Sequence, residues 1–322
     1  MKQIGLGLMG LGNIGIGTWK TLEMNGETIK KNTGIDFKFI KVLEKNVDAK
    51  RDIDVDKGMF TSDPQDLFTN DDIDIVIELL GGIEPAASFM LDALNHGKHV
   101  VTANKAAVAA NYDKLLAAAE KNNVMFRYEA SVGGGIPILN PLLTVLRGNE
   151  IESIMGILNG TTNYILTQMT DFGLDFDAVL KTAQEKGFAE ADPTADVEGI
   201  DVANKLSILM AIAFDKYVKP QEIKTTGITG ITKQDIENAK SKGAKIKLVA
   251  GAKKLANGEL EYEVGPMEIA DDHPLASVSN EFNAVFLKGN AVDELMFYGK
   301  GAGPLPTGSA VVGDLIDIAQ RI

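Results

Sequence analysis

The feature that most constrains the fold is a glycine pattern at the end of the first apolar segment. The N-terminal stretch IGLGLMGLGNIG reads as a buried strand that runs into Gly10, Gly12 and Gly15, spaced as G-x-G-x-x-G. Between a strand and a helix, the first glycine permits a tight turn, the second lets the backbone approach a pyrophosphate, and the third allows close helix–strand packing. The helix N-terminus adds free N–H groups and positive potential. We therefore expect Gly10, Gly12, Asn13, Ile14 and Gly15 to bind a dinucleotide; the alternative is a glycine-rich turn without a ligand.

The first third of the chain alternates strand-like and helix-like segments. The pattern predicts strands at 4–10, 37–44, 72–81, 98–104 and 124–132, and helices at 16–24, 62–68, 85–97 and 112–123. Strands that alternate with helices favour a parallel, doubly wound sheet.

The pattern changes at the glycine- and proline-rich stretch SVGGGIPILNP. Beyond it we expect an apolar helix at 202–214, antiparallel strands at 244–254, 260–269 and 284–299, and a C-terminal helix that packs back on the first domain. The fold class we predict is α/β, with a Rossmann-type doubly wound sheet in residues 1–138, completed by 302–322. An α+β domain is inserted at 139–301.

Composition excludes several classes of function. The net charge of −13 opposes binding to nucleic-acid phosphates. The chain has no cysteine and 3 histidines, which removes thiolate chemistry, argues against a histidine-rich zinc site and fits a reducing compartment. No signal-peptide pattern and no apolar run of roughly 18–20 residues is present, so we expect a cytoplasmic protein without membrane contact.

A nicotinamide site without zinc or cysteine leaves lysine, tyrosine or a carboxylate as the acid–base group. The stretch FAEADPTADVEGIDVANK places five carboxylates before Lys205 and the apolar run LSILMAIAF. Asp201 and Lys205, four residues apart, share one face of a helix. The carboxylates favour the charged lysine, whereas burial opposes it. The alternative is a solvated acidic loop with an exposed ion pair.

Two other positions concern the cofactor. Lys105, in TANK, is expected at the end of a strand and hence in the crevice where doubly wound sheets bind ligands, with a surface lysine as the alternative. At the end of the second strand, Glu44 could bind a ribose 2′-hydroxyl. Lys45, Lys50 or Arg51 could instead meet a 2′-phosphate, so NAD and NADP both stay open.

Seven segments along the chain resemble the homoserine dehydrogenase family. They are GLGNIG, ELLGGIEPA, VTANKA, EASVGGGIPI, LNGTTNYIL, FAEADPTADVEGIDVANKL and GKGAGPLPTGSAVVGD, in this order. The resemblance implies reversible interconversion of L-homoserine and L-aspartate 4-semialdehyde with NAD or NADP, in threonine and methionine biosynthesis. It also implies that residues 139–301 serve catalysis and dimerisation, in a homodimer or homotetramer whose interface lies on the late strands.

The resemblance assigns roles to individual residues. Lys205 becomes the proton donor and acceptor at the substrate oxygen, and the substrate ammonium is bound by Glu190, Asp196 and Asp201. Lys105 lies beside nicotinamide and substrate, and Gly303 lies near the cofactor. In EASVGGGIPI the family binds a monovalent cation, sodium or potassium, through main-chain carbonyls, which here belong to Glu129, Val132, Gly134 and Ile136.

Two rival functions remain at this point. One is another lysine-dependent NAD(P) oxidoreductase that acts on a different amino acid. The other is a dinucleotide-sensing protein that has lost catalysis, against which the presence of both Lys105 and Lys205 argues. Some family members carry a C-terminal regulatory domain, and the sequence ends at VVGDLIDIAQRI, so we expect weak or absent feedback by threonine.

Overall fold

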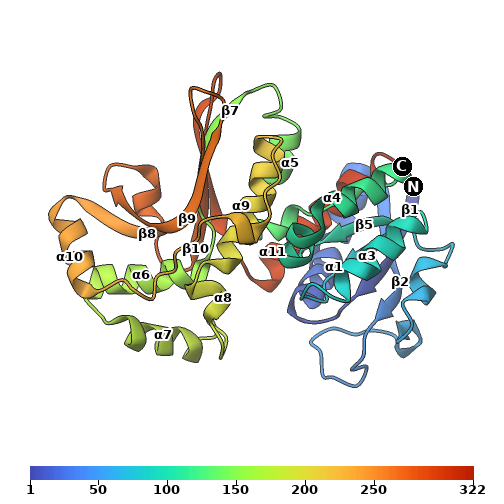
Figure 1. The fold of residues 1–322 in the computed structure, drawn as a ribbon. Coiled ribbons are helices and arrows are strands. Elements are labelled where there is room, and N and C mark those ends of the chain that lie inside the picture. The colour runs from blue at the N-terminus through green and yellow to red at the C-terminus, as the bar shows by residue number, and fades with distance from the viewer. The chain divides into compact units, whose positions relative to one another are not determined.

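The computed structural model describes residues 1–322, which divide into two compact units. The first unit comprises Met1–Gly135 and Ala302–Ile322, and the second comprises Ile136–Gly301. Each unit has its own sheet (Figure 1), so the predicted α/β class with a second sheet domain is confirmed.

The sheet of the first unit is parallel throughout. Its strands are β1 (Lys2–Met9), β2 (Ile35–Leu43), β3 (Phe60–Thr61), β4 (Ile75–Glu78), β5 (His99–Thr102) and β6 (Phe126–Arg127). They lie in the order β3-β2-β1-β4-β5-β6, with parallel pairing at every step. The direction of winding reverses between β1 and β4. Such a switch point opens a ligand crevice at the carboxyl ends of the strands, as in a Rossmann fold.

Helices pack against these strands. They are α1 (Asn13–Thr33), α2 (Gln65–Phe68), α3 (Ala86–Asn95), α4 (Lys105–Lys121) and the C-terminal α11 (Pro304–Ala319). Because strand–helix–strand crossovers are right-handed, α1 and α3 lie on opposite faces of the sheet. Helix α11 packs on α1 at two glycines: a Cβ on Gly308 would lie 2.6 Å from the backbone of Gly17.

Several local predictions in this unit were wrong in extent. The helix expected at 112–123 begins at Lys105 and ends at Lys121, and the strand expected at 72–81 is only Ile75–Glu78. The helix expected at 16–24 runs on to Thr33, and ends where Gly34 adopts the left-handed conformation (φ 75°). The strand expected at 124–132 is only Phe126–Arg127, followed by the 3₁₀ turn η2 (Glu129–Ser131). The chain turns there because the η2 backbone is held by α11: the Glu129 N–H donates to Asp314 Oδ2 at 2.9 Å.

The sheet of the second unit is antiparallel. Its strands are β7 (Ile151–Ile157), β8 (Ala244–Lys254), β9 (Leu260–Ala270), β10 (Phe282–Gly289) and β11 (Asp293–Lys300), in the order β11-β10-β7-β8-β9. The pairing of β8 with β9 runs the full length of both strands. The predicted strands at 244–254 and 260–269 therefore match β8 and β9.

The second unit also contains helices. They are α5 (Leu139–Leu143), α6 (Gly160–Phe172), α7 (Phe176–Glu185), α8 (Thr194–Val197), α9 (Ile200–Ala213) and α10 (Lys233–Ser241). Helices α6, α9 and α10 all contact β8. The apolar run predicted as a helix forms α9 and is buried along most of its length. No helix in either unit has both the length and the apolar character to cross a membrane.

Candidate active site

The centre of the site in the second unit is a buried ion pair on the first turns of α9. Lys205 Nζ lies 2.6 Å from Asp201 Oδ2, and the two residues are only 8% and 6% exposed. Lys205 Nζ also donates a hydrogen bond to the main-chain carbonyl of Leu158, at 2.6 Å. The alternative of an exposed ion pair is therefore wrong. An ammonium and a carboxylate removed from water persist as ions only when they are paired and hydrogen-bonded, and both conditions are met here.

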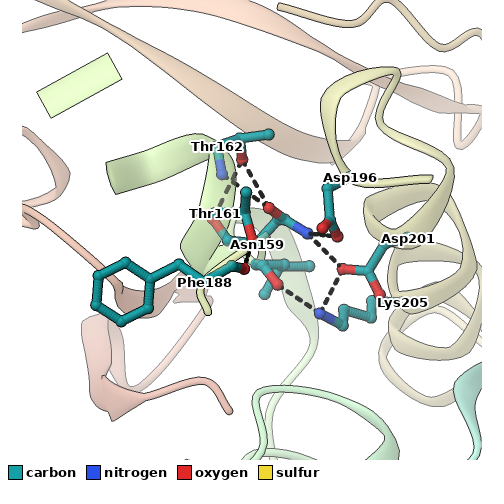
Figure 2. A network of polar contacts seen from close by, with 8 residues as sticks. Asn159, Thr161, Thr162, Phe188, Asp196, Asp201 and Lys205 are labelled. Carbon is teal, nitrogen blue, oxygen red and sulfur yellow. Dashed lines mark hydrogen bonds and ion pairs between the residues drawn. The ribbon is translucent and has the colours of Figure 1, made fainter. Parts of the chain in front are cut away.

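Asn159 joins this pair to a second carboxylate. Its Nδ2 donates to Asp201 Oδ2 at 2.9 Å and to Asp196 Oδ1 at 2.7 Å, as Figure 2 shows. Its Oδ1 accepts from the Thr162 N–H at 2.9 Å and so caps the N-terminus of α6. One asparagine, absent from the residues predicted for the site, thus connects β7, α6, α8 and α9. The available signal was an asparagine before Gly-Thr-Thr, the position of a helix cap.

Of the three predicted ammonium-binding carboxylates, the structure brings two together. Asp196 and Asp201 lie in the network around Asn159, whereas Glu190 is exposed in the loop after α7 and outside that network. The loop is tied to α6 by a hydrogen bond of 2.6 Å from Thr161 Oγ1 to the Phe188 carbonyl. The acidic stretch is therefore divided between a cluster of buried Asp201 and half-buried Asp196 and an exposed loop.

The glycine-rich loop follows β1 in the first unit. Gly10 has a φ of 93°, and a Cβ there would lie 2.8 Å from the carbonyl oxygen of Leu79, so a larger residue fits neither the conformation nor the space. A Cβ on Gly15 would overlap the carbonyl oxygen of Gly10. Gly12 differs, because apart from its neighbours in the chain nothing lies within 4 Å of the position that a Cβ would take. Open space at the N-terminus of α1, beside Asn13 and Ile14, suits the phosphates of a dinucleotide.

A buried acid lies at the carboxyl edge of the same sheet. Glu78, at the end of β4, is fully buried and accepts hydrogen bonds from Thr102 Oγ1 and the Leu80 N–H at 2.7 and 2.8 Å. Burial raises the pKa of its carboxyl, although these hydrogen bonds oppose the rise. Asn104, which caps α4 through a 3.1 Å bond to the Ala107 N–H, lies beside it. Lys105 is the first residue of that helix and is half-buried at the strand end where the sequence predicted it.

The remaining predicted residues lie around η2 and α11. The main chain turns after Val132 through Gly133 and Gly134, whose φ angles are 74° and 56°. Gly303 (φ 120°) immediately precedes α11. No group of three or more acidic or histidine side chains is placed to hold a metal ion. A cation here would depend on main-chain carbonyls, and left-handed glycines can turn these toward one point.

The chemistry available is therefore a carboxylate-held lysine in one unit and a dinucleotide-type phosphate loop in the other. A lysine positioned in this way can give a proton to a substrate oxygen or take one from it.

Family models, relatives in sequence and solved structures all agree on one family. Two family models match, "Homoserine dehydrogenase" over residues 137–316 and "Homoserine dehydrogenase, NAD binding domain" over residues 10–129. A homoserine dehydrogenase of Bacillus subtilis (strain 168) is 43% identical over 100% of this chain and 74% of that protein. A homoserine dehydrogenase structure from Thiobacillus denitrificans has a TM-score of 0.94 and 44% identity, covering 99% of this chain and 74% of that one. A hyperthermophilic archaeal homoserine dehydrogenase in complex with NADPH has a TM-score of 0.83 and 26% identity, covering 99% and 98%.

Proposed function

The chain belongs to the homoserine dehydrogenase family of NAD(P)-dependent oxidoreductases. From this premise we propose that it interconverts L-homoserine and L-aspartate 4-semialdehyde, and that Lys205 moves the proton in this reaction. The observation that carries the proposal is the buried Lys205–Asp201 pair at 2.6 Å, tied by Asn159 to Asp196.

Lys205 acts at the hydroxyl of homoserine. When bound, NAD(P) supplies the acceptor or donor of the hydride. As the carbon–hydrogen bond breaks, Lys205 in its neutral amine form takes the proton of the hydroxyl and becomes the ammonium that pairs with Asp201. In the reverse direction this ammonium gives its proton to the carbonyl oxygen. Asp201 and the Leu158 carbonyl fix the position of Nζ, since both bonds to it are 2.6 Å. An amine held in place in this way loses little entropy on reaching the transition state.

The carboxylates bind the substrate ammonium. A free amino acid carries a positive charge that carboxylates recognise, and we assign this role to Glu190, Asp196 and Asp201. Asp196 and Asp201 are supported by their shared contact with Asn159, and Asp201 also by its ion pair with Lys205. The exposed position of Glu190 is compatible with contact to a substrate that enters from solvent.

The first unit binds the dinucleotide. We assign the pyrophosphate to the loop of Gly10, Gly12, Asn13, Ile14 and Gly15, supported by the open space above Gly12. We further assign Lys105 to the nicotinamide and substrate end, supported by its place at the carboxyl edge of β5, and Gly303 to the cofactor. An archaeal relative was solved with NADPH, which supports a nicotinamide dinucleotide in this chain as well.

We also propose a sodium or potassium ion held by the carbonyls of Glu129, Val132, Gly134 and Ile136. The left-handed Gly133 and Gly134 support this assignment. Turnover measured in sodium, potassium or choline chloride at equal ionic strength tests it: equal rates in all three would remove the cation from the account.

For the assembly we propose a homodimer or homotetramer, with the late strands at its interface and the cytoplasm as its compartment. Support comes from the edge strand β11, which exposes Met296 (39%) and Tyr298 (52%). Light scattering of the purified protein tests this proposal, and a monomer at micromolar concentration would contradict it.

The reaction is tested by absorbance at 340 nm with L-homoserine and either NAD or NADP. We expect reduced nicotinamide to form with homoserine and hardly at all with 1-propanol, which lacks the amino group. Activity confined to a different amino acid would favour the rival oxidoreductase. Tight dinucleotide binding without any turnover would favour the sensing protein.

A further inference from the structure

Glu44, the first residue after β2, turns its side chain toward the glycine-rich loop. Its Oε2 accepts from the Leu11 N–H at 3.1 Å, and its Oε1 accepts from the Asn46 N–H at 2.9 Å. Leu11 stands between Gly10 and Gly12, so the carboxylate lies directly beside the proposed pyrophosphate loop. In doubly wound folds the adenosine ribose lies at this strand end.

Arg51 lies on the other side of this carboxylate. Its Nη2 is 3.2 Å from Glu44 Oε2, and the arginine side chain is only 9% exposed. The guanidinium also donates to three main-chain carbonyls, those of Leu11, Ala49 and Asn46, at 3.1, 3.2 and 2.7 Å. It lies 5.7 Å from the centroid of the Phe60 ring. Each of the three guanidinium nitrogens of Arg51 therefore contacts an acceptor within the protein, where the side chain holds the loop and the carboxylate.

The carboxylate is ionised at neutral pH. Its partial burial would raise the pKa of Glu44, but the N–H groups of Asn46 and Leu11 and the charge of Arg51 outweigh burial and hold the pKa below its ordinary value. An ionised carboxylate has about four acceptor sites. The donors of Leu11, Asn46 and Arg51 occupy three of them on Glu44, which leaves one for a ribose hydroxyl of NAD. The 2′-phosphate of NADP would place about two negative charges against it, and such like-charge contact is strongly unfavourable.

We propose that Glu44 makes this enzyme select NAD(H) over NADP(H), by accepting a ribose hydroxyl and repelling a 2′-phosphate. The inference rests on the proposed function, since it names the cofactor of that same reaction. The opposing candidates are Lys45 and Lys50, which are exposed in the following loop and would favour the phosphate.

Binding titrations of the full chain with NADH and NADPH, followed by nicotinamide fluorescence without substrate, test the inference. Wild type is expected to bind NADH about 10²-fold more tightly. Glu44→Gln keeps an acceptor for the ribose but removes the charge, so NADH affinity should change by no more than about threefold while NADPH affinity rises at least about tenfold. The matched control is Asp52→Asn, which removes the same charge from an exposed residue of the same loop that pairs with Lys20 and should leave the ratio unchanged.

Equal or tighter binding of NADPH by wild type would overturn the inference whatever the variants do. An unchanged ratio in Glu44→Gln would overturn it as well. Failure of the inference and failure of the proposed function give different results. Selective binding of NADH without turnover of homoserine would refute the reaction and leave the selectivity standing. Turnover of homoserine with equal binding of NADH and NADPH would refute the selectivity and leave the reaction standing.

Discussion

Lys247 carries a charge into the core of the second unit, and its removal should change how stability depends on pH. The residue lies on β8 and is 2% exposed. Its Nζ donates to the Val278 carbonyl at 2.6 Å and to Asn163 Oδ1 at 3.0 Å. Burial, assisted by the charge of Lys245, lowers its pKa from the ordinary 10.5 to about 8.

The magnitude follows from this difference in pKa. A pKa lowered from 10.5 to about 8 corresponds to about 3 kcal/mol of unfavourable free energy for the folded, charged state. Below pH 8 the lysine is protonated in both folded and unfolded chains, and the full cost is present. Between pH 8 and 10.5 the folded chain has released the proton while the unfolded chain still binds it, so this group makes the protein more stable as the pH rises.

The variant Lys247→Met keeps the length of the side chain and removes the charge. Between pH 7 and pH 10 the free energy of unfolding of wild type should therefore rise by about 2.5 kcal/mol relative to that of Lys247→Met, because only wild type has a buried charge to lose. Urea unfolding followed by far-UV circular dichroism measures this difference, with Lys253→Met, an exposed position on the same strand, as the control. A difference between Lys247→Met and wild type that stays constant from pH 7 to 10 would refute the reasoning, since Lys247 would then keep its proton in the fold.

Three further predictions concern the site. Glu190→Gln should raise KM for homoserine at least about tenfold with little change in kcat, because an ammonium contact is made in ground and transition states alike; an unaltered KM would place that contact elsewhere. Asn159→Ala should lower kcat by about 10²-fold through misplacement of Asp201, and unchanged turnover would show that the bridge does not position it. Gly15→Ala should lower thermal stability because its Cβ overlaps the Gly10 carbonyl, whereas Gly12→Ala should leave stability unchanged and weaken NADH binding; equal melting temperatures for the two variants would contradict this.

The sequence predicts best where the signal is local. The strand before the glycine loop, the apolar α9 and the i, i+4 pair of Asp201 and Lys205 all follow from residues close together in the chain. The extent of α1 could not be predicted from nearby residues. The pair Asn25-Gly26 is typical of a turn, yet the helix continues through it to the C-cap at Gly34. Packing of α1 against α11 overrides the local preference there.

The least predictable contacts are those between distant segments. Asn159 reaches Asp201 across 42 residues, and the Leu158 carbonyl meets Lys205 across 47. Every residue has a main-chain carbonyl, so the sequence does not show which carbonyl accepts a hydrogen bond. An asparagine before a helix is already explained by its role as a cap, so its contact with Asp201 could not be inferred. Glu78 was likewise hidden, since an acid inside an apolar strand pattern shows its role only when Thr102 of the neighbouring strand is placed against it.

The most direct test of the account is the turnover of Lys205→Ala with L-homoserine, beside NADH titration of the same protein. Removal of the group that moves the proton should lower kcat by about 10²–10⁴-fold. Binding of NADH should stay within about twofold of wild type, and the exposed Lys181→Ala should match wild type in both measurements. Added methylamine should restore part of the lost rate, because a free amine can enter the space left by the side chain and move the proton. Near-normal turnover in a folded Lys205→Ala variant would contradict the central claim and assign the proton to another group.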